Sequence, residues 1–588
     1  MTNRRDFLKM GAGMAAAGAA TGVAAGVEAA TGEPSAHANA PRPNIILILA
    51  DDMGFSDIGC FGSEIATPNL DKLAKRGMRL TEYYNNPRCC PSRASIMTGL
   101  YAHQAGMGNM VVDHNRYPFA AYAGILSAQT VTIPEALKGA GYSTAMVGKW
   151  HLAPETAESK SQWPLQRGFD RFSGMIAGAS VYYESPHLFE GNTPLPPPAK
   201  DQYLTDIWAE KAASYVTELA VEKQKPFFLY AAFNAPHWPI QAPEEDVKRY
   251  ADRYREGWDK LREERHAKQI AEGIVDPKWP LSPRDPRVPA WEKAEDKEWE
   301  IRRMAVYAAM IDKLDQGIGR IVDAVEKAGV MENTLIVFMS DNGGNAEELG
   351  RGQRTLPVAD SPEGPLHGFD PKGSIPCEGG MTCAGNVPGV MPGGEETFQS
   401  IGIPWGNCTN TPFRLYKHYA QEGGISSPFV ACWPKMIKPT GRPIAAVGHE
   451  TDLMPTFLEA AGVAYPTHVA AGPIPAFVGQ SLMPLFGGKS RTRKPIFWEH
   501  EGNKAVRDGQ WKLVSRFPEQ WELYDMEADR TELHDLAAAQ PARAEAMAAM
   551  WDGWAKLVGA QPWPMPQTPP GERTGEMGTP PYLRKYKA

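Results

Sequence analysis

Four short apolar runs, each followed closely by polar residues, constrain the fold more strongly than any other feature of this sequence. The runs have the length of strands and are continuously apolar, as expected for strands buried on both faces. They cover residues 44–50, 143–147, 227–233 and 335–339. Helical stretches separate them, among them residues 67–77, 134–138 and 305–328. Alternating strands and helices predict a parallel sheet covered by helices on both faces.

The polar residues after these runs are of the kinds that bind cations and anions. They are Asp51 and Asp52, Lys149 and His151, His237, and Asp341 and Asn342. In open α/β sheets the ligand binds beyond the carboxyl ends of the strands. The sequence therefore predicts that metal-binding and anion-binding side chains meet at one edge of the sheet.

The chain changes character twice after these runs. Residues 343–410 are rich in Gly and Pro and lack periodicity, and a loop this long inside a domain is either functional or disordered. We therefore expect a catalytic domain over residues 41–487 that carries a long insertion. The highly charged region 244–300 is interpreted as solvated helices and loops.

A smaller α+β domain is expected over residues 488–588. The segments 496–498, 505–507 and 511–514 favour antiparallel strands, the last two joined by a tight turn at Asp508-Gly509. Residues 541–557 predict a covering amphipathic helix, and the Pro-rich end predicts an extended tail.

The N-terminal segment is typical of an export signal. Residues 3–9 (NRRDFLK) form a twin-arginine pattern, a Gly/Ala-rich apolar run covers 10–26, and Ala36-His37-Ala38 fits the pattern of a cleavage site. We expect residues 1–38 to be removed and the folded protein to be periplasmic or secreted. An uncleaved membrane anchor is the alternative, but the run is weakly apolar and short for a span, so no stable membrane association is expected.

Net charge and cysteine content limit the possible partners and the possible disulfide bonds. The formal net charge is −8, which disfavours nucleic acid as a partner, so any anion site must concentrate positive charge locally. Seven cysteines are too few for a disulfide scaffold in a chain of 588 residues. Cys377 and Cys383 are close enough in sequence to bridge, although sequence alone does not establish the pair.

The segment Cys89-Cys90-Pro91-Ser92-Arg93 and the residues to Gly99 carry the most specific motif. Residues 92–94 are expected to open a helix, whose N-terminal N–H groups and dipole would favour an anion. A structural cysteine pair or a vicinal disulfide is the alternative, but neither accounts for Arg93. The motif C-x-P-S-R resembles the signature of type I sulfatases, especially bacterial arylsulfatases, and the resemblance covers nearly the whole mature chain.

This resemblance implies a fold and a nucleophile. The fold would be α/β of the alkaline-phosphatase type, with a mixed, mostly parallel sheet between helices and a smaller C-terminal α+β domain. Cys89, two residues before the proline, would be converted to formylglycine (3-oxoalanine) by a formylglycine-generating enzyme. One hydroxyl of the hydrated aldehyde would attack sulfur, and the other would lose its proton to expel sulfate.

The resemblance also implies roles for the strand-end residues. Asp51, Asp52, Asp341 and Asn342 are hard oxygen donors suited to Ca²⁺ or Mg²⁺ rather than zinc. They match the family's metal ligands, which implies Ca²⁺ in preference to Mg²⁺, with the modified Cys89 as a further ligand. Acidic residues after a single strand are often only helix caps, but two pairs after two strands favour a metal.

The basic residues lie in segments that resemble the family's other motifs. These segments are Gly148-Lys149-Trp150-His151, Pro236-His237-Trp238-Pro239, and 411–417 (TPFRLYK), which leads to Glu422-Gly423-Gly424. Carried over, Arg93, Lys149, His237 and Lys417 would bind sulfate, and His151 would be the base on the formylglycine diol. Either His237 or Lys417 would protonate the leaving oxygen.

The expected activity is hydrolysis of a small-molecule or glycan sulfate ester, in the manner of an arylsulfatase. Aryl, alkyl and carbohydrate sulfates are all compatible with these motifs. A phosphonate monoester or phosphodiester hydrolase is one alternative, although such enzymes usually have Asp-His where this chain has Asp341-Asn342. A non-catalytic protein that binds sulfated glycans is another, and it predicts the loss of a core residue, whereas every matched position is filled.

Overall fold

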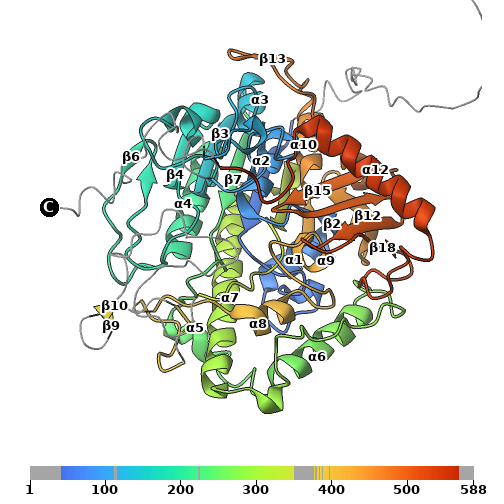
Figure 1. Ribbon diagram of the computed structural model, residues 1–588. Helices are drawn as coiled ribbons and strands as arrows, with labels where there is room; N and C mark the ends of the chain where they lie inside the picture. Colours follow the sequence, from blue (N-terminus) through green and yellow to red (C-terminus); the bar gives the residue numbers. More distant parts are fainter. Residues whose placement is uncertain are drawn as a thin grey trace, which may run out of the picture. The chain divides into compact units, whose positions relative to one another are not determined.

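The four apolar runs form the middle of a large mixed sheet in the computed structural model (Figure 1). The structure describes residues 42–111, 116–222, 225–349, 376–377, 381–382, 385–386, 388–395 and 397–567. The expected signal peptide, about half of the Gly/Pro-rich insertion, Cys383 and the end of the tail lie outside these residues.

The strands of the main sheet follow the order β12-β2-β11-β8-β1-β7-β3-β4-β5-β6. Their bounds are β1 Asn44–Ala50, β2 Met78–Tyr84, β3 Ser143–Lys149, β4 Arg171–Met175, β5 Phe189–Glu190, β6 Thr193–Pro194, β7 Phe227–Ala232, β8 Thr334–Ser340, β11 Ser426–Cys432 and β12 Ile444–His449. Two short hairpins pair β9 Pro376–Cys377 with β10 Met381–Thr382, and β13 His468–Val469 with β14 Gly472–Pro473.

The centre of this sheet is parallel, as the sequence predicts. Strand β1 lies between β8 and β7, with Leu47 opposite Val337 on one side and Tyr230 on the other. Strands β3 and β4 continue the parallel arrangement. Strand β11 pairs antiparallel with both β8 and β2, so the sheet is mixed and mostly parallel. The expected fold class is confirmed.

Helices cover both faces of the sheet. The α-helices are α1 Pro68–Arg76, α2 Cys89–Thr98, α3 Ile133–Gly139, α4 Leu204–Leu219, α5 Glu244–Lys248, α6 Gly257–Ala271, α7 Lys297–Lys327, α8 Gly402–Thr409, α9 Glu422–Ile425, α10 Leu453–Ala461, α11 Met483–Phe486 and α12 Pro541–Val558. Short 3₁₀ helices are η1 Gly59–Phe61, η2 Ala120–Tyr122, η3 Lys160–Gln162, η4 Pro164–Arg167, η5 Trp291–Lys293, η6 Met331–Asn333 and η7 Glu450–Asp452.

Burial of both faces of strand β1 explains why its run is apolar without interruption. Its alternate side chains enter two separate cores, one with Ile46 and Ile48 and the other with Ile45, Leu47 and Leu49. Helices α1, α4 and α7 contribute to the first core, and α2, α3 and α10 contribute to the second. Since both faces are covered, neither set of side chains can be polar.

The C-terminal part forms the expected antiparallel sheet with a helix across it (Figure 1). Its strands are β15 Ile496–His500, β16 Asn503–Asp508, β17 Trp511–Ser515 and β18 Glu522–Asp525. Val506 and Leu513 pack under α12 with Met547. Ala505 and Val514 face the other way, in a cluster with Tyr84 of β2. Gly509, at φ 57°, makes the turn between β16 and β17.

Buried charges join this sheet to the main sheet. Lys512 Nζ donates to Glu422 Oε1 at 2.8 Å, and Arg530 Nε donates to Glu422 Oε2 at 3.0 Å. All three side chains are fully buried. Removing one partner of such a cluster would leave a buried charge without compensation.

Several local expectations differ from the structure. Helix α2 begins at Cys89 rather than at residues 92–94, which places the cysteine itself in the first turn. The region 244–300 is not uniformly solvated, because α6 buries Arg265 against Asp57 and Glu64. Those partners lie about 200 positions away in the sequence, so local charge density does not reveal them.

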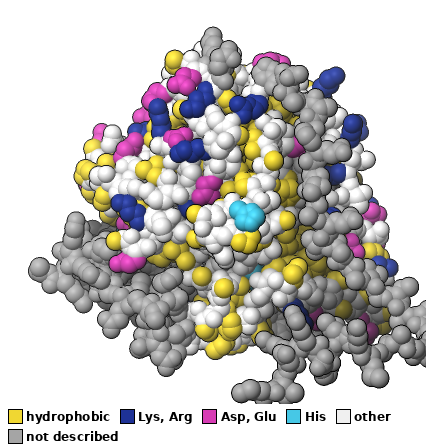
Figure 2. All heavy atoms as spheres, turned by 90° about the horizontal axis from the view of Figure 1, so that it is seen from above, with side chains coloured by type: hydrophobic (Ala, Val, Ile, Leu, Met, Phe, Trp, Pro, Cys, Tyr) yellow, Lys and Arg dark blue, Asp and Glu magenta, His cyan; other side chains and the backbone are white. Residues whose placement is uncertain are grey.

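Two further features are the hydropathy of the helices and the distribution of charged side chains on the surface. No helix within the described ranges combines the length and the apolar character that a bilayer span requires. On the face drawn in Figure 2, basic and acidic side chains are interspersed with scattered hydrophobic groups.

Candidate active site

The acidic residues meet at the carboxyl ends of β1 and β8. These two strands are paired in parallel up to Ala50 and Ser340, so the residues that follow them lie side by side. The Asp52 backbone N–H donates to Asp341 Oδ1 at 3.2 Å, and Asn342 Nδ2 donates to Asp52 Oδ1 at 2.7 Å. The side chains of Asp51, Asp52, Asp341 and Asn342 are fully buried.

Asp52 is the most heavily bonded of the four. Its Oδ2 accepts from Asn345 Nδ2 at 2.6 Å and from Lys417 Nζ at 3.0 Å. Its backbone has φ 65°, in the left-handed region that a residue other than glycine rarely adopts. Such strain persists only where the surroundings impose it, and it is common at functional sites.

Cys89 lies in the first turn of α2, and its side chain is 1% exposed. Arg93 follows four residues later, so both side chains lie on the same face of the helix. Arg93 Nε donates to Asp341 Oδ2 at 3.0 Å, and Arg93 Nη1 donates to the Lys149 carbonyl at 2.8 Å. The helix N-terminus is thereby attached to the ends of both β8 and β3.

The basic residues reach the same place from three other segments. Lys149, the last residue of β3, donates from Nζ to Asp51 Oδ2 at 2.6 Å. A ring nitrogen of His151 and the sulfur atoms of Cys89 and Cys90 lie within 4.8 Å of one another. His237 Nε2 lies 3.4 Å from Asp52 Oδ2, and its Nδ1 donates to the Trp238 carbonyl at 2.7 Å.

Burial and neighbouring charges set the protonation of these groups. Burial raises the pKa of Asp51 to about 6, although Lys149 and Arg93 oppose the shift. Burial also lowers the pKa values of His151 and His237, each to about 4. A hydrogen bond from Cys90 is the main cause that holds the pKa of Cys89 well below its usual range.

The acidic residues fit a hard divalent cation. Among the residues that the structure describes, Asp51 Oδ1 and Asn342 Oδ1 are buried oxygens without a hydrogen-bond donor. Asp51 Oδ1 lies 3.7 Å from Arg93 Nη2. Buried oxygens are normally satisfied, and a cation that prefers oxygen ligands would satisfy both.

Sequence reasoning missed three residues of the site, Arg88, Asn345 and Glu347. Asn345 donates to Asp52. Glu347 accepts from Arg88 Nη1 at 3.0 Å and lies 3.2 Å from Lys417 Nζ. Trp238, which lies in a segment that the sequence singled out, also donates to Glu347 from Nε1. Asn345 and Glu347 follow β8 within seven residues of its end, and that position is the signal that could have found them.

The structure brings the residues predicted from the sequence into one buried cluster, and their roles stay predictions. The cluster contains Asp51, Asp52, Cys89, Arg93, Lys149, His151, His237, Asp341, Asn342 and Lys417.

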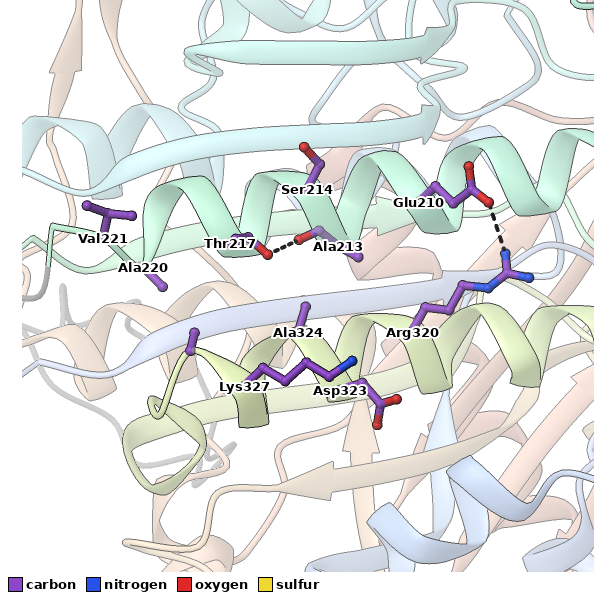
Figure 3. Close-up of a pocket in the computed structure, with 11 residues that line it drawn as sticks. Glu210, Ala213, Ser214, Thr217, Ala220, Val221, Arg320, Asp323, Ala324 and Lys327 are labelled. Atoms are coloured by element: carbon purple, nitrogen blue, oxygen red, sulfur yellow. Dashed lines mark hydrogen bonds and ion pairs between the residues drawn. The ribbon is translucent and has the colours of Figure 1, made fainter.

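A separate open hollow of about 780 Å³ lies between α4 and α7 (Figure 3). It includes Glu210 and Arg320, which lie 3.9 Å apart, and none of the predicted site residues lines it.

Comparison with known proteins identifies the class. Residues 43–463 match the Sulfatase family model, and residues 413–558 match the model for the C-terminal region of N-sulphoglucosamine sulphohydrolase. The chain belongs to the sulfatase family and is a sulfuric ester hydrolase.

Three relatives show how far the similarity extends. The chain is 34% identical to an uncharacterized sulfatase of Schizosaccharomyces pombe, over 81% of this chain and 86% of the relative. It is 33% identical to an arylsulfatase of Klebsiella aerogenes, over 78% of this chain and 95% of the relative. The solved structure of Ps i-CgsB in complex with k-i-k-neocarrahexaose has a TM-score of 0.62 and 26% identity, over 87% of this chain and 93% of the other.

Proposed function

We propose that this sulfatase works through a formylglycine made from Cys89, with Ca²⁺ held by Asp51, Asp52, Asp341 and Asn342. One observation carries the proposal: Cys89 opens a buried helix at the point where carboxylates, two lysines and two histidines converge. A plain structural cysteine would not require this concentration of charge.

The formylglycine would be made during maturation by a formylglycine-generating enzyme. Its hydrated aldehyde supplies a hydroxyl nucleophile and, on the same carbon, a second hydroxyl whose proton can be removed to release sulfate. His151 is buried beside Cys89 and, with a pKa near 4, is neutral at working pH. In the neutral form its ring offers a lone pair that can accept that proton.

Positive charge around Cys89 would bind the sulfate group. Lys149 and Lys417 extend buried ammonium groups to the two carboxylates after β1. Burial opposes the charge on Lys417, but Asp52 and Glu347 outweigh it and raise the pKa of this lysine above its usual value. The N–H groups at the start of α2 add donors on the same side.

A divalent cation bound at the carboxylates lowers the pKa of a coordinated hydroxyl and polarises sulfur. Asp51 Oδ1 and Asn342 Oδ1 would be two of its ligands, because both oxygens are buried without a donor in the described residues. Carboxylate and amide oxygens suit Ca²⁺, which accepts six to eight such ligands, better than zinc.

Either His237 or Lys417 would protonate the leaving oxygen. Lys417 carries a proton, because Asp52 and Glu347 favour its charged form. His237 presents Nε2 to the site, since its Nδ1 donates to the Trp238 carbonyl, but burial lowers its pKa to about 4, so Nε2 would have to be protonated first. The variant that removes the acid, His237→Gln or Lys417→Met, should lose activity most strongly on esters of poorly acidic alcohols, and activated aryl esters should suffer least.

The substrate would be a small-molecule or glycan sulfate ester. Similarity to the arylsulfatase of Klebsiella aerogenes supports activity on aryl sulfates. Similarity to Ps i-CgsB, solved with k-i-k-neocarrahexaose, supports a test on sulfated carbohydrates. We also propose export to the periplasm or beyond through the twin-arginine route, which Arg4→Lys with Arg5→Lys should block in cell fractionation.

The decisive experiment is the mass of the peptide that contains residue 89, in protein from the native host. Conversion of the thiol to the aldehyde lowers the mass by about 18 Da. Cys89→Ala should abolish both the mass change and hydrolysis of 4-nitrophenyl sulfate, whereas Cys90→Ser should keep both. Active protein with an unmodified thiol at residue 89 would refute the proposal, and higher turnover of a phosphonate monoester would favour the alternative hydrolase.

A further inference from the structure

A second cluster of metal-binding side chains lies where the segment after Lys417 meets the end of β15. It consists of His418, His500 and Glu501, and one ligand atom from each lies within 4.8 Å of the other two. None of these residues belongs to the proposed Ca²⁺ site. We propose that this cluster binds a Zn²⁺ ion.

His500 is the strongest indication of a ligand. Its side chain is 1% exposed. Within the described part of the chain, neither of its ring nitrogens has a hydrogen-bond partner. Buried polar groups are normally satisfied, and a neutral imidazole has only one nitrogen that can donate. A metal ion would supply the missing partner for the nitrogen that carries the lone pair.

The other two residues point to the same place. His418 Nδ1 lies 3.6 Å from Glu501 Oε2, which is too long for a hydrogen bond. The rings of His418 and His500 are 5.5 Å apart and nearly perpendicular. His418 and Glu501 have φ values of 88° and 50°, so the chain adopts a strained backbone at both positions.

Charge and protonation in the cluster suit a cation. Burial lowers the pKa of His418 to about 3 and that of His500 below its usual value, so both rings are neutral and offer lone pairs. Glu501 supplies one negative charge. Arg88 and Lys417 are neighbouring cations that oppose metal binding, and Glu347 offsets both, at 3.0 Å from Arg88 and 3.2 Å from Lys417.

Two imidazoles and a carboxylate favour zinc over calcium. Zn²⁺ commonly takes nitrogen and carboxylate ligands, and sites with three protein ligands keep one open position. Ca²⁺ prefers an all-oxygen shell of six or more ligands, which these three residues do not provide.

Asn503 gives the inference a sharp consequence. Its Nδ2 lies 3.2 Å from His418 Nε2 and donates to the His500 carbonyl at 3.2 Å, and its Oδ1 accepts from the Phe517 backbone N–H at 3.1 Å. Zinc at His418 Nδ1 leaves the ring proton on Nε2, where it needs an acceptor rather than a donor. Asn503→Asp supplies an acceptor to His418 and keeps the one to Phe517, although it loses the bond to the His500 carbonyl. Because it also adds a negative charge beside the cation, it should bind zinc more tightly than the wild-type chain.

An ion here would hold two segments that border the candidate active site. The His418 backbone N–H donates to the Pro87 carbonyl at 2.7 Å, and Trp498 Nε1 donates to the Asn85 carbonyl at 2.8 Å. Both carbonyls lie just before Cys89. Zinc would therefore attach the end of β15 to the segment that begins after Lys417. Through these two hydrogen bonds it would also stabilise the residues that precede α2.

The test is a zinc titration of the full-length protein against a competing chelator, with Ca²⁺ in excess to occupy the acidic site. We expect one Zn²⁺ per chain. His500→Ala and Glu501→Gln should each weaken zinc binding on the order of 100-fold, and Asn503→Asp should strengthen it about tenfold. His468→Ala, at an exposed histidine of β13, is the matched control and should bind zinc as the wild type does.

Three outcomes would overturn the proposal. One is a wild-type chain that retains no zinc against the chelator, and another is affinity unchanged in Glu501→Gln. The third is a thiolate charge-transfer band after Co²⁺ substitution, which would place the ion at Cys89 and Cys90. Far-ultraviolet circular dichroism of each variant separates loss of zinc from loss of folding.

Discussion

Asn345 provides the sharpest test of how the acidic site is organised, because no sequence motif identified it. Its Nδ2 donates to Asp52 Oδ2 at 2.6 Å, and both side chains are buried. Asn345→Ala removes this donor and leaves Asp52 less firmly oriented. The residues that follow β8 would then no longer hold the carboxylate in place for a cation.

The magnitude follows from the bond that is lost. A hydrogen bond to a charged group contributes about 1.5–3 kcal/mol, and each 1.4 kcal/mol corresponds to about a tenfold change in an equilibrium constant. Asn345→Ala should therefore weaken Ca²⁺ binding by about 10- to 140-fold. This range agrees with the 10–100-fold effects typical of residues that orient metal ligands.

The assay is calorimetric titration of Ca²⁺ into chelator-treated protein, combined with hydrolysis of 4-nitrophenyl sulfate across a Ca²⁺ series. Activity of Asn345→Ala should recover at high Ca²⁺, since the reacting groups are intact. Asn69→Ala is the matched control, because Asn69 Nδ2 makes the same kind of bond, 2.9 Å to Asp315, at the start of α1. Equal Ca²⁺ affinity in Asn345→Ala and wild type would refute the reasoning.

Three further predictions concern charge and packing. Lys149→Met should lower kcat about 10²–10³-fold at saturating 4-nitrophenyl sulfate, because a buried donor beside Asp51 is lost. Glu422→Gln should reduce the free energy of unfolding by about 3–5 kcal/mol in denaturant titrations, since Lys512 loses a buried partner. Burial opposes ionisation of Glu422, but Lys512 is the main cause that lowers its pKa to about 2. The stabilisation from this ion pair is therefore present above the unfolded pKa near 4.5, and it should disappear as the pH falls from there toward 2. Glu422→Gln should show no such loss of stability over this range. Ile48→Ala should reduce the free energy of unfolding by about 2–5 kcal/mol through a cavity in the fully buried core, with kcat at 25 °C unchanged.

The central strands and their polar ends could be predicted because their signals are local. The run at 44–50 coincides with β1, and the other three runs lie in β3, β7 and β8 with ends that differ by no more than two residues. A strand buried on both faces must be apolar throughout, and the residue after it necessarily emerges at the sheet edge.

The extent of some helices followed less well from local signals. The sequence predicts a helix from 305, but α7 begins at Lys297. Its first turns bury Trp299, whose Nε1 donates to Gln399 Oε1 at 2.9 Å, and Arg303, which donates to the Ser400 carbonyl at 2.8 Å. These partners lie about 100 positions further along the chain, so only the folded structure explains the added turns.

By itself, therefore, the sequence determined the α/β class, the sulfatase motif at Cys89 and the set of polar residues delivered to one edge of the sheet. Tertiary structure decided which of these groups touch, how Asn345 and Glu347 complete the site, and that His418 meets His500. The physical reason is the separation in sequence of the residues that interact. Apolar periodicity and strand exits depend on neighbours in the sequence, whereas hydrogen bonds and ion pairs depend on segments that meet only when the chain folds.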